Sequence, residues 1–286
     1  MPDYPRPVLL ELAGVRTHVA VDPPTGPVSG PPVVLCSGLA GNWFDWDACT
    51  ALLSASRTVV RPDRPGYGLS DPWPDGALPT LESEVTRLRE LLDALELPTA
   101  VVCGHSMAGF YVEAFARLYP ERTAGMLLLD GSVEVRPPWT LPARVRDGLL
   151  LRTADAAAAA HINRAGPLAH RLLAGSPAPE RFTPILSSEA YLRAALLENG
   201  QYPVLARGLS DLRGRKPLRV GLPATVAAAY TGRPTPWAAS WLRRQRELAD
   251  RLGARFAVIS PSGHHAMVDQ PAQTAALILD VDRAGG

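Results

Sequence analysis

The stretch that decides the fold is Val101-Val102-Cys103-Gly104-His105-Ser106-Met107-Ala108-Gly109, an apolar run that passes through a serine into an amphipathic segment. A sharp turn from strand to helix would hold Ser106 in a strained backbone conformation with its hydroxyl exposed. Such a turn requires small residues two positions before and after the serine, and Gly104 and Ala108 meet this requirement. The pattern predicts a nucleophile at Ser106, and the plainer alternative is a serine that only caps the helix.

Other apolar runs of strand length are continuous rather than alternating, which indicates strands covered on both faces. They are Val33–Cys36, Thr58–Arg61, Ala100–Cys103, Met126–Leu129, Ala224–Tyr230 and Arg255–Ile259, preceded by a strand pair at Val8–Leu12 and Val15–Val21. Helical spacing of apolar residues predicts helices at Leu81–Leu97, Met107–Tyr119, Trp237–Leu252 and Pro271–Val281. Strands that alternate with helices predict an α/β fold, with a doubly wound, mostly parallel eight-stranded sheet and helices on both faces.

Residues 132–219 interrupt this alternation, because they contain no convincing strand and several prolines between short amphipathic pieces. We interpret them as a helical cap inserted after the sixth strand, with residues 1–131 and 220–286 forming one core domain. The alternative is an independent second domain, although no flexible linker flanks the segment. An insertion that leaves from the carboxyl edge of the sheet would cover the crevice in which α/β sheets bind ligands.

Composition excludes several classes of protein. The chain has 286 residues and a formal net charge of +1, which argues against a nucleic-acid partner. An apolar share of 47% is too high for a disordered protein. No uncharged apolar run reaches the roughly 18 residues of a membrane span, and the first residues lack a signal-peptide pattern, so we expect a cytoplasmic protein. Cys36, Cys49 and Cys103 lack metal-ligand spacing and are expected to be buried.

A serine hydroxyl needs a base, and the base needs a carboxylate to orient it. His264 follows the last strand, at the sheet edge where Ser106 also lies, and Gly263 before it allows the loop to turn inward. His264 is therefore the preferred base, with His265 as the alternative. Asp130 ends the sixth strand at the same edge and is the best candidate for the acid, its alternative role being to cap the following turn.

Over nearly its whole length, the chain resembles the α/β-hydrolase family. Ser37-Gly38-Leu39-Ala40-Gly41 is similar to the family's His-Gly-x-x-Gly loop after the third strand, and residues 63–70 resemble its Asp-x-x-Gly-x-Gly-x-Ser loop, which is structural in most members. Ser262-Gly263-His264 resembles the family's Gly-His near the C-terminus, and the order serine, acid, histidine is kept. The resemblance implies that the backbone amides of Leu39 and Met107 form an oxyanion hole.

Three positions depart from the family's pattern. Ser37 replaces the histidine that normally braces the oxyanion loop, and Ala108 replaces the commoner glycine of the elbow. The family's acid usually follows the seventh strand, where this chain has no carboxylate. Some members place the acid after the sixth strand instead, which is the position of Asp130.

These patterns predict a serine hydrolase that cleaves an ester-like bond (ester, lactone or thioester) of a small, mainly apolar molecule through an acyl-enzyme. No cofactor or metal is expected, and the sequence gives no indication of an oligomeric state. Asn42, Trp43 and Trp139 are expected to line the substrate pocket. The alternatives are a carbon–carbon bond hydrolase, a lyase or an acyl transferase that uses the same three residues, and a ligand-binding receptor built on this fold.

Overall fold

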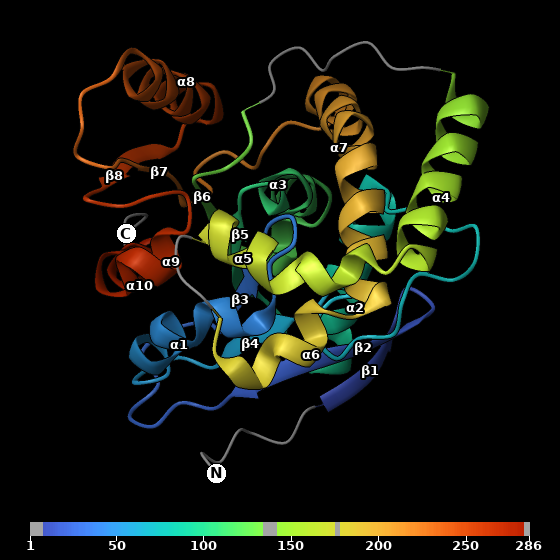
Figure 1. Cartoon of the computed structure of the whole chain (residues 1–286). Helices are drawn as coiled ribbons and strands as arrows, with labels where there is room; N and C mark the ends of the chain where they lie inside the picture. The colour runs from blue at the N-terminus through green and yellow to red at the C-terminus, as the bar shows by residue number, and fades with distance from the viewer. Residues whose placement is uncertain (1–7, 134–141, 175–177, 283–286) are drawn as a thin grey trace.

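An eight-stranded sheet forms the centre of the computed structural model, which describes residues 8–133, 142–174 and 178–282 (Figure 1). The strands are β1 (Val8–Leu12), β2 (Val15–Asp22), β3 (Val33–Cys36), β4 (Val59–Pro62), β5 (Ala100–His105), β6 (Thr123–Leu129), β7 (Ala224–Ala229) and β8 (Arg255–Ile259). They are arranged in the order β1-β2-β4-β3-β5-β6-β7-β8. The β1–β2 and β2–β4 pairs are antiparallel and the remaining pairs are parallel, which confirms the predicted fold class.

Helices cover both faces of this sheet (Figure 1). They are α1 (Asp47–Leu53), α2 (Leu81–Ala94), α3 (Ala108–Leu118), α4 (Ala143–Ala159), α5 (Gly166–Ala174), α6 (Thr183–Leu186), α7 (Glu189–Arg215), α8 (Pro236–Leu252), α9 (Ala266–Asp269) and α10 (Pro271–Asp280). The α2, α3 and α8 helices pack on one face, and α1, α9 and α10 pack on the other. Among the described residues, no helix is both long enough and apolar enough to cross a membrane.

The two apolar layers follow directly from the period of two along each strand. In β3, Val33 and Leu35 are buried against the α1 and α10 layer, whereas Val34 and Cys36 are buried against the α2 and α3 layer. A strand that must fill both layers has no position left for a polar side chain, which explains the continuous apolar runs.

The segment between β6 and β7 contains no strand in its described part and holds α4 to α7, in agreement with a helical insertion after the sixth strand. Its last helix differs from the expected short pieces, because α7 continues for 27 residues through Pro203. Proline inside a helix costs about 3 kcal/mol. Leu197 and Leu205, on either side of Pro203, are buried in separate apolar clusters, so tertiary packing offsets this cost.

The second half of α7 belongs to the same apolar layer as α2 and α3. Leu205, Leu209 and Leu212 are buried there. The insertion is therefore fixed to the core along half of its longest helix, and this contact brings α7 residues close to the loops at the carboxyl edge of the sheet.

The three cysteines are free and buried, as expected. Burial raises the pKa of Cys36 and of Cys49 to about 12, and it raises the pKa of Cys103 well above its ordinary value. These thiols are therefore protonated at neutral pH and act as small apolar side chains.

Candidate active site

Ser106 occupies the turn between β5 and α3. Its φ of 53° lies in the left-handed region, which costs energy for a residue with a Cβ. A Cβ on Gly104 would lie 2.8 Å from the backbone carbonyl of Ala108, and a Cβ on Gly38 would lie 2.8 Å from the Cβ of Ser106. Glycine at these two positions therefore allows the strand, the helix and the loop after β3 to approach one another.

Hydrogen bonds join Ser106 to His264 and His264 to Asp130. The Nε2 atom of His264 is 2.9 Å from the Ser106 hydroxyl, and its Nδ1 atom is 2.6 Å from Oδ2 of Asp130. The His264 side chain is 44% exposed and that of Asp130 only 5%. Because the carboxylate accepts the Nδ1 proton, Nε2 is left to accept the proton of the serine hydroxyl.

Asp130 is held by donors on its other oxygen. Its Oδ1 atom accepts hydrogen bonds from the backbone amide of Ala229 at 2.9 Å and from the indole Nε1 of Trp241 at 2.7 Å. A carboxylate with three donors is strongly oriented. From the sequence, Trp241 is expected only to contribute to the apolar face of a helix. Its contact with Asp130 depends on how α8 packs against the end of β6, which local sequence does not show.

Two further histidines pack beside His264. The Nε2 atom of His105 is 2.9 Å from the backbone carbonyl of His264, to which it must donate. Burial, together with the neighbouring His264 and His265, lowers the pKa of His105 well below its ordinary value. Burial and the charge of His264 lower the pKa of His265 to about 4. Both rings are therefore neutral at pH 7, and it is the ring of His264 that reaches Ser106.

The loop Ser37–Gly41 lies against the serine turn. The Ser37 hydroxyl donates to the carbonyl of Asn42 at 2.9 Å and accepts from the indole of Trp46 at 3.0 Å, so it bonds within its own loop. Within the described residues, no backbone hydrogen bond uses the amides of Leu39 or Met107 as donors.

The residues expected to line a pocket are placed as follows. Asn42 is buried, and its Oδ1 atom accepts from the amide of Gly68 at 3.0 Å. Trp43 is buried against His18 and Phe182. Trp139 lies outside the described residues. A pocket role for these three residues stays a prediction.

A cavity of about 430 Å³ opens beside His264, and its walls are mostly apolar. Asp130, His264, Trp237 and Trp241 are among its lining residues. In the part of the chain that the structure describes, no group of three or more His, Cys, Asp and Glu side chains is arranged to hold a metal ion.

A family model described as the alpha/beta hydrolase fold matches residues 31–271. The chain belongs to this family. Within the alpha/beta hydrolase fold family, it is 31% identical to the (lyso)-N-acylphosphatidylethanolamine lipase of Mus musculus over 164 residues, which cover 54% of this chain and 45% of the lipase. It is 36% identical to the 2-hydroxy-6-oxo-2,4-heptadienoate hydrolase of Pseudomonas putida over 110 residues, or 37% of this chain and 39% of that enzyme.

Among solved structures, Cfl2 from Burkholderia cenocepacia superposes with a TM-score of 0.72 at 21% identity, covering 96% of this chain and 97% of Cfl2. At this identity the likeness concerns the fold alone. The matches to the lipase and to the heptadienoate hydrolase each span less than half of the relative's length. Activity and substrate are therefore inferred from the residues of this chain.

Proposed function

We propose that the protein is a serine hydrolase that cleaves an ester-like bond of a small, mainly apolar substrate, without a cofactor. The observation that carries this proposal is the hydrogen-bonded series Ser106–His264–Asp130, in which the serine has a left-handed φ and the histidine a correctly directed Nε2. A hydroxyl, a base and an orienting carboxylate in this order are the components of nucleophilic acyl transfer.

In the first half-reaction, the Ser106 oxygen attacks the substrate carbonyl carbon while Nε2 of His264 accepts the hydroxyl proton. Collapse of the tetrahedral intermediate breaks the bond to the leaving group, which takes that proton from His264. In the second half-reaction, His264 removes a proton from water, the resulting oxygen nucleophile attacks the acyl-enzyme, and Ser106 recovers its proton. Asp130 keeps its negative charge throughout and stabilises the imidazolium.

The backbone amides of Leu39 and Met107 are proposed as the donors to the oxyanion. They lie on the two segments that meet at Ser106, namely the loop after β3 and the first turn of α3. The start of α3 also directs its backbone dipoles towards this point. Donors that are already oriented stabilise the developing charge without reorganisation.

The cavity beside His264 is lined mainly by apolar surface that includes Trp237 and Trp241 but not Ser106, so it borders the proposed base rather than the nucleophile. An apolar substrate portion is proposed for this side of the site. His264 delivers a proton to the leaving group, so the part of the substrate beside this ring is the alcohol or thiol portion. We further propose the division into a core, residues 1–131 and 220–286, and a cap, residues 132–219, that covers the substrate.

A second candidate is a carbon–carbon bond hydrolase that uses the same three residues, favoured by the 36% identity to the heptadienoate hydrolase of Pseudomonas putida. An acyl transferase shares the same steps up to the attack by water, whereas a lyase would break its bond by elimination with these residues and form no acyl-enzyme. Product analysis with added alcohols or thiols separates hydrolysis from transfer, because a transferase forms a new ester or thioester.

The test of the main proposal is a fluorophosphonate probe combined with a turnover screen. The wild type should be labelled at Ser106 and should hydrolyse p-nitrophenyl esters, lactones or acyl thioesters, whereas Ser106→Ala should lose labelling and about 10⁴-fold or more of the rate. Equal labelling of the two proteins would refute the proposal. A single slow turnover followed by a stable complex would favour a ligand receptor instead.

A further inference from the structure

Arg64 connects the loop after β3, which holds the proposed oxyanion donor Leu39, to the inserted helices, a role that no local sequence pattern indicates. It follows β4 and its side chain is 5% exposed. Its Nη1 atom donates to the backbone carbonyl of Ser37, and its Nη2 atom donates to the carbonyl of Gly38 at 2.7 Å. Its Nε and Nη2 atoms also bind the Glu198 carboxylate of α7 at 2.6 and 3.0 Å.

The contact with Gly38 matters because the Gly38 carbonyl and the Leu39 amide belong to one peptide group. A cation hydrogen-bonded to the carbonyl oxygen withdraws electron density from that group and makes the N–H at its other end a stronger donor. The same bond fixes the plane of the peptide, and so the direction of the Leu39 N–H.

We infer that Arg64 is a positioning residue for the oxyanion site, and that Glu198 holds the Arg64 guanidinium in place from the inserted helix α7. The inference rests on the proposed function, since it assigns Leu39 as an oxyanion donor. It also answers which group braces the loop in the absence of the family's histidine. That group is a buried cation from the loop after β4, itself held by a residue of the insertion.

The surroundings of the pair support a fixed geometry. The Tyr67 hydroxyl donates to Oε2 of Glu198 at 2.9 Å, and the Tyr111 hydroxyl donates to the Ser37 carbonyl at 3.2 Å. Burial alone would lower the pKa of Arg64, but the charge and hydrogen bonds of Glu198 raise it well above its ordinary value, so the guanidinium stays charged.

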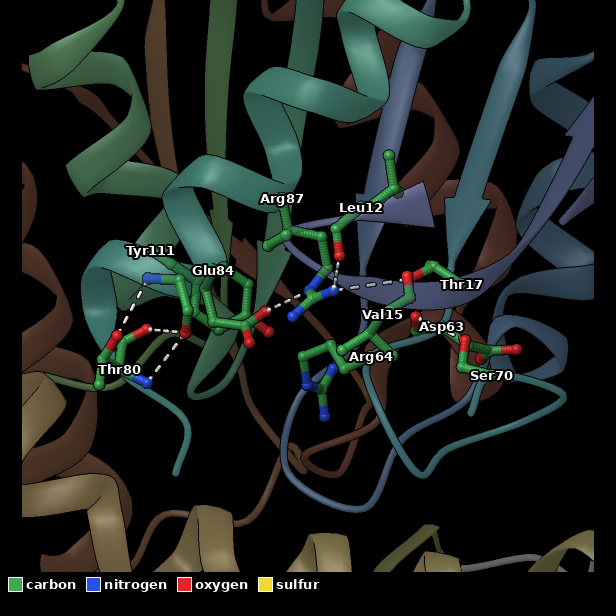
Figure 2. Close-up of polar contacts among 12 residues, drawn as sticks. Leu12, Val15, Thr17, Asp63, Arg64, Ser70, Thr80, Glu84, Arg87 and Tyr111 are labelled. Carbon is green, nitrogen blue, oxygen red and sulfur yellow. Dashed lines mark hydrogen bonds and ion pairs between the residues drawn. The ribbon is translucent and has the colours of Figure 1, made fainter. Parts of the chain in front are cut away.

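A second buried ion pair, Glu84 and Arg87, lies beside Arg64 but, among the described residues, forms no hydrogen bond with the loop after β3 (Figure 2). The Nε atom of Arg87 is 3.6 Å from Oε2 of Glu84, and its Nη1 atom donates to the backbone carbonyl of Leu12 at 2.7 Å. The second contact ties α2 to the first strand pair. Arg64 is therefore the buried cation of this region that reaches the oxyanion loop. The competing explanation is that Arg64 and Glu198 only stabilise the fold.

Three variants separate positioning from stability. Arg64→Met removes the cation but leaves Glu198 buried without its partner, so both kcat and stability should fall. The double variant Arg64→Met/Glu198→Leu leaves no unpaired buried charge, so it should regain part of the stability lost in Arg64→Met. The recovery is partial because the Gly38 carbonyl and the Tyr67 hydroxyl lose their partners. Arg213→Met is the control, because Arg213 joins α7 to Glu113 of α3 at 2.6 Å without contacting the oxyanion loop.

The experiment measures kcat, KM and the rate of fluorophosphonate labelling, with urea unfolding in parallel. In both Arg64 variants we expect kcat and the labelling rate to fall about tenfold or more, with KM within about twofold of the wild type. The double variant should recover part of the stability without recovering kcat, and Arg213→Met should keep the wild-type kcat.

Recovery of kcat together with stability in the double variant would overturn the inference, as would an unchanged kcat in Arg64→Met. Such a result leaves the proposed function intact, because the wild type is still labelled at Ser106 and still turns over. A wild type that is neither labelled nor active would overturn the proposed function, and this inference with it.

Discussion

Asp130 and Glu198 are both buried carboxylates that bind one basic side chain near Ser106, yet they are held by different parts of the chain. Asp130 orients His264 and receives its other donors from β7 and α8, all within the sheet domain. Glu198 orients Arg64 from the inserted helix α7. In the proposed mechanism, the first carboxylate acts on the proton carrier, and the second acts on the loop that we propose as the donor to the oxyanion.

This difference predicts different consequences of losing each charge. The acid corner, which we define as Asp130, His264, Ala229 and Trp241, contains a reacting group and several neutral donors. The arginine corner, defined as Arg64, Glu198, Tyr67 and Tyr111, contains a full buried ion pair. Loss of charge at the acid corner should affect mainly the rate, and loss of charge at the arginine corner should affect both rate and stability.

The largest effect is expected for Asp130→Asn. An amide at this position can no longer accept the Nδ1 proton of His264 and stabilise the imidazolium, so kcat should fall by about 10³- to 10⁴-fold. The shape of the side chain is kept and Oδ1 can still accept from Ala229 and Trp241, so the melting temperature should change little. Ester turnover and thermal unfolding measure the two effects, and a near-normal rate would assign the acid to another residue.

The second effect concerns Glu198→Gln, which leaves the buried Arg64 without a counter-charge. Breaking a buried ion pair in this way costs about 3 kcal/mol of unfolding free energy, measured by urea denaturation. The matched control is Glu113→Gln, because the Glu113 side chain is also 1% exposed and binds two arginines.

Both glutamine variants should lose stability, but only Glu198→Gln should also lose kcat. Equal kcat values in the two variants would remove the distinction between the arginine corner and an ordinary buried ion pair.

The third effect is pH-dependent and concerns the histidines that pack against the acid corner. Burial and the charge of His264 lower the pKa of His265 from 6.5 to about 4. At pH values between these two pKa values, His265 is protonated in the unfolded chain and neutral in the folded protein. His265 therefore lowers the free energy of unfolding as pH falls from about 6.5 to about 4, with no further loss below that range. The total loss is about 3 kcal/mol at most.

Unfolding free energies measured across this pH range test the prediction. His265→Gln should flatten the pH dependence. The exposed His161, replaced in the same way, serves as the control, and a curve that His265→Gln leaves unchanged would contradict the assignment.

Local patterns were sufficient for the strands, the serine turn and the pairing of Asp130 with His264. Each of these residues ends or follows a strand at the carboxyl edge of a parallel sheet, so topology alone brings them together. Trp241 and Glu198 could not be predicted in this way, because their positions depend on how α8 and α7 pack on the sheet. The prolines of the insertion even suggested short helices, whereas the packing of α7 keeps one helix intact through Pro203.

The smallest effect expected at the two corners is that of Trp241→Phe. Phenylalanine keeps an aromatic ring beside Trp237, with which Trp241 stacks, but it removes the N–H that donates to Oδ1 of Asp130 at 2.7 Å. The amide of Ala229 still holds that oxygen. A hydrogen bond to a charged group contributes about 1.5–3 kcal/mol, and one remaining donor compensates in part, so kcat/KM should fall about tenfold.

The matched control is Trp73→Phe. Trp73 is buried, and within the described residues its indole nitrogen has no hydrogen-bond partner, so this exchange makes the same change from indole to phenyl without removing a hydrogen bond. A tenfold loss in Trp241→Phe with an unchanged rate in Trp73→Phe would show that the neutral donors of the acid corner orient Asp130. A wild-type rate in Trp241→Phe would mean that Ala229 and His264 alone are sufficient, and that the two corners differ only in where their charges lie.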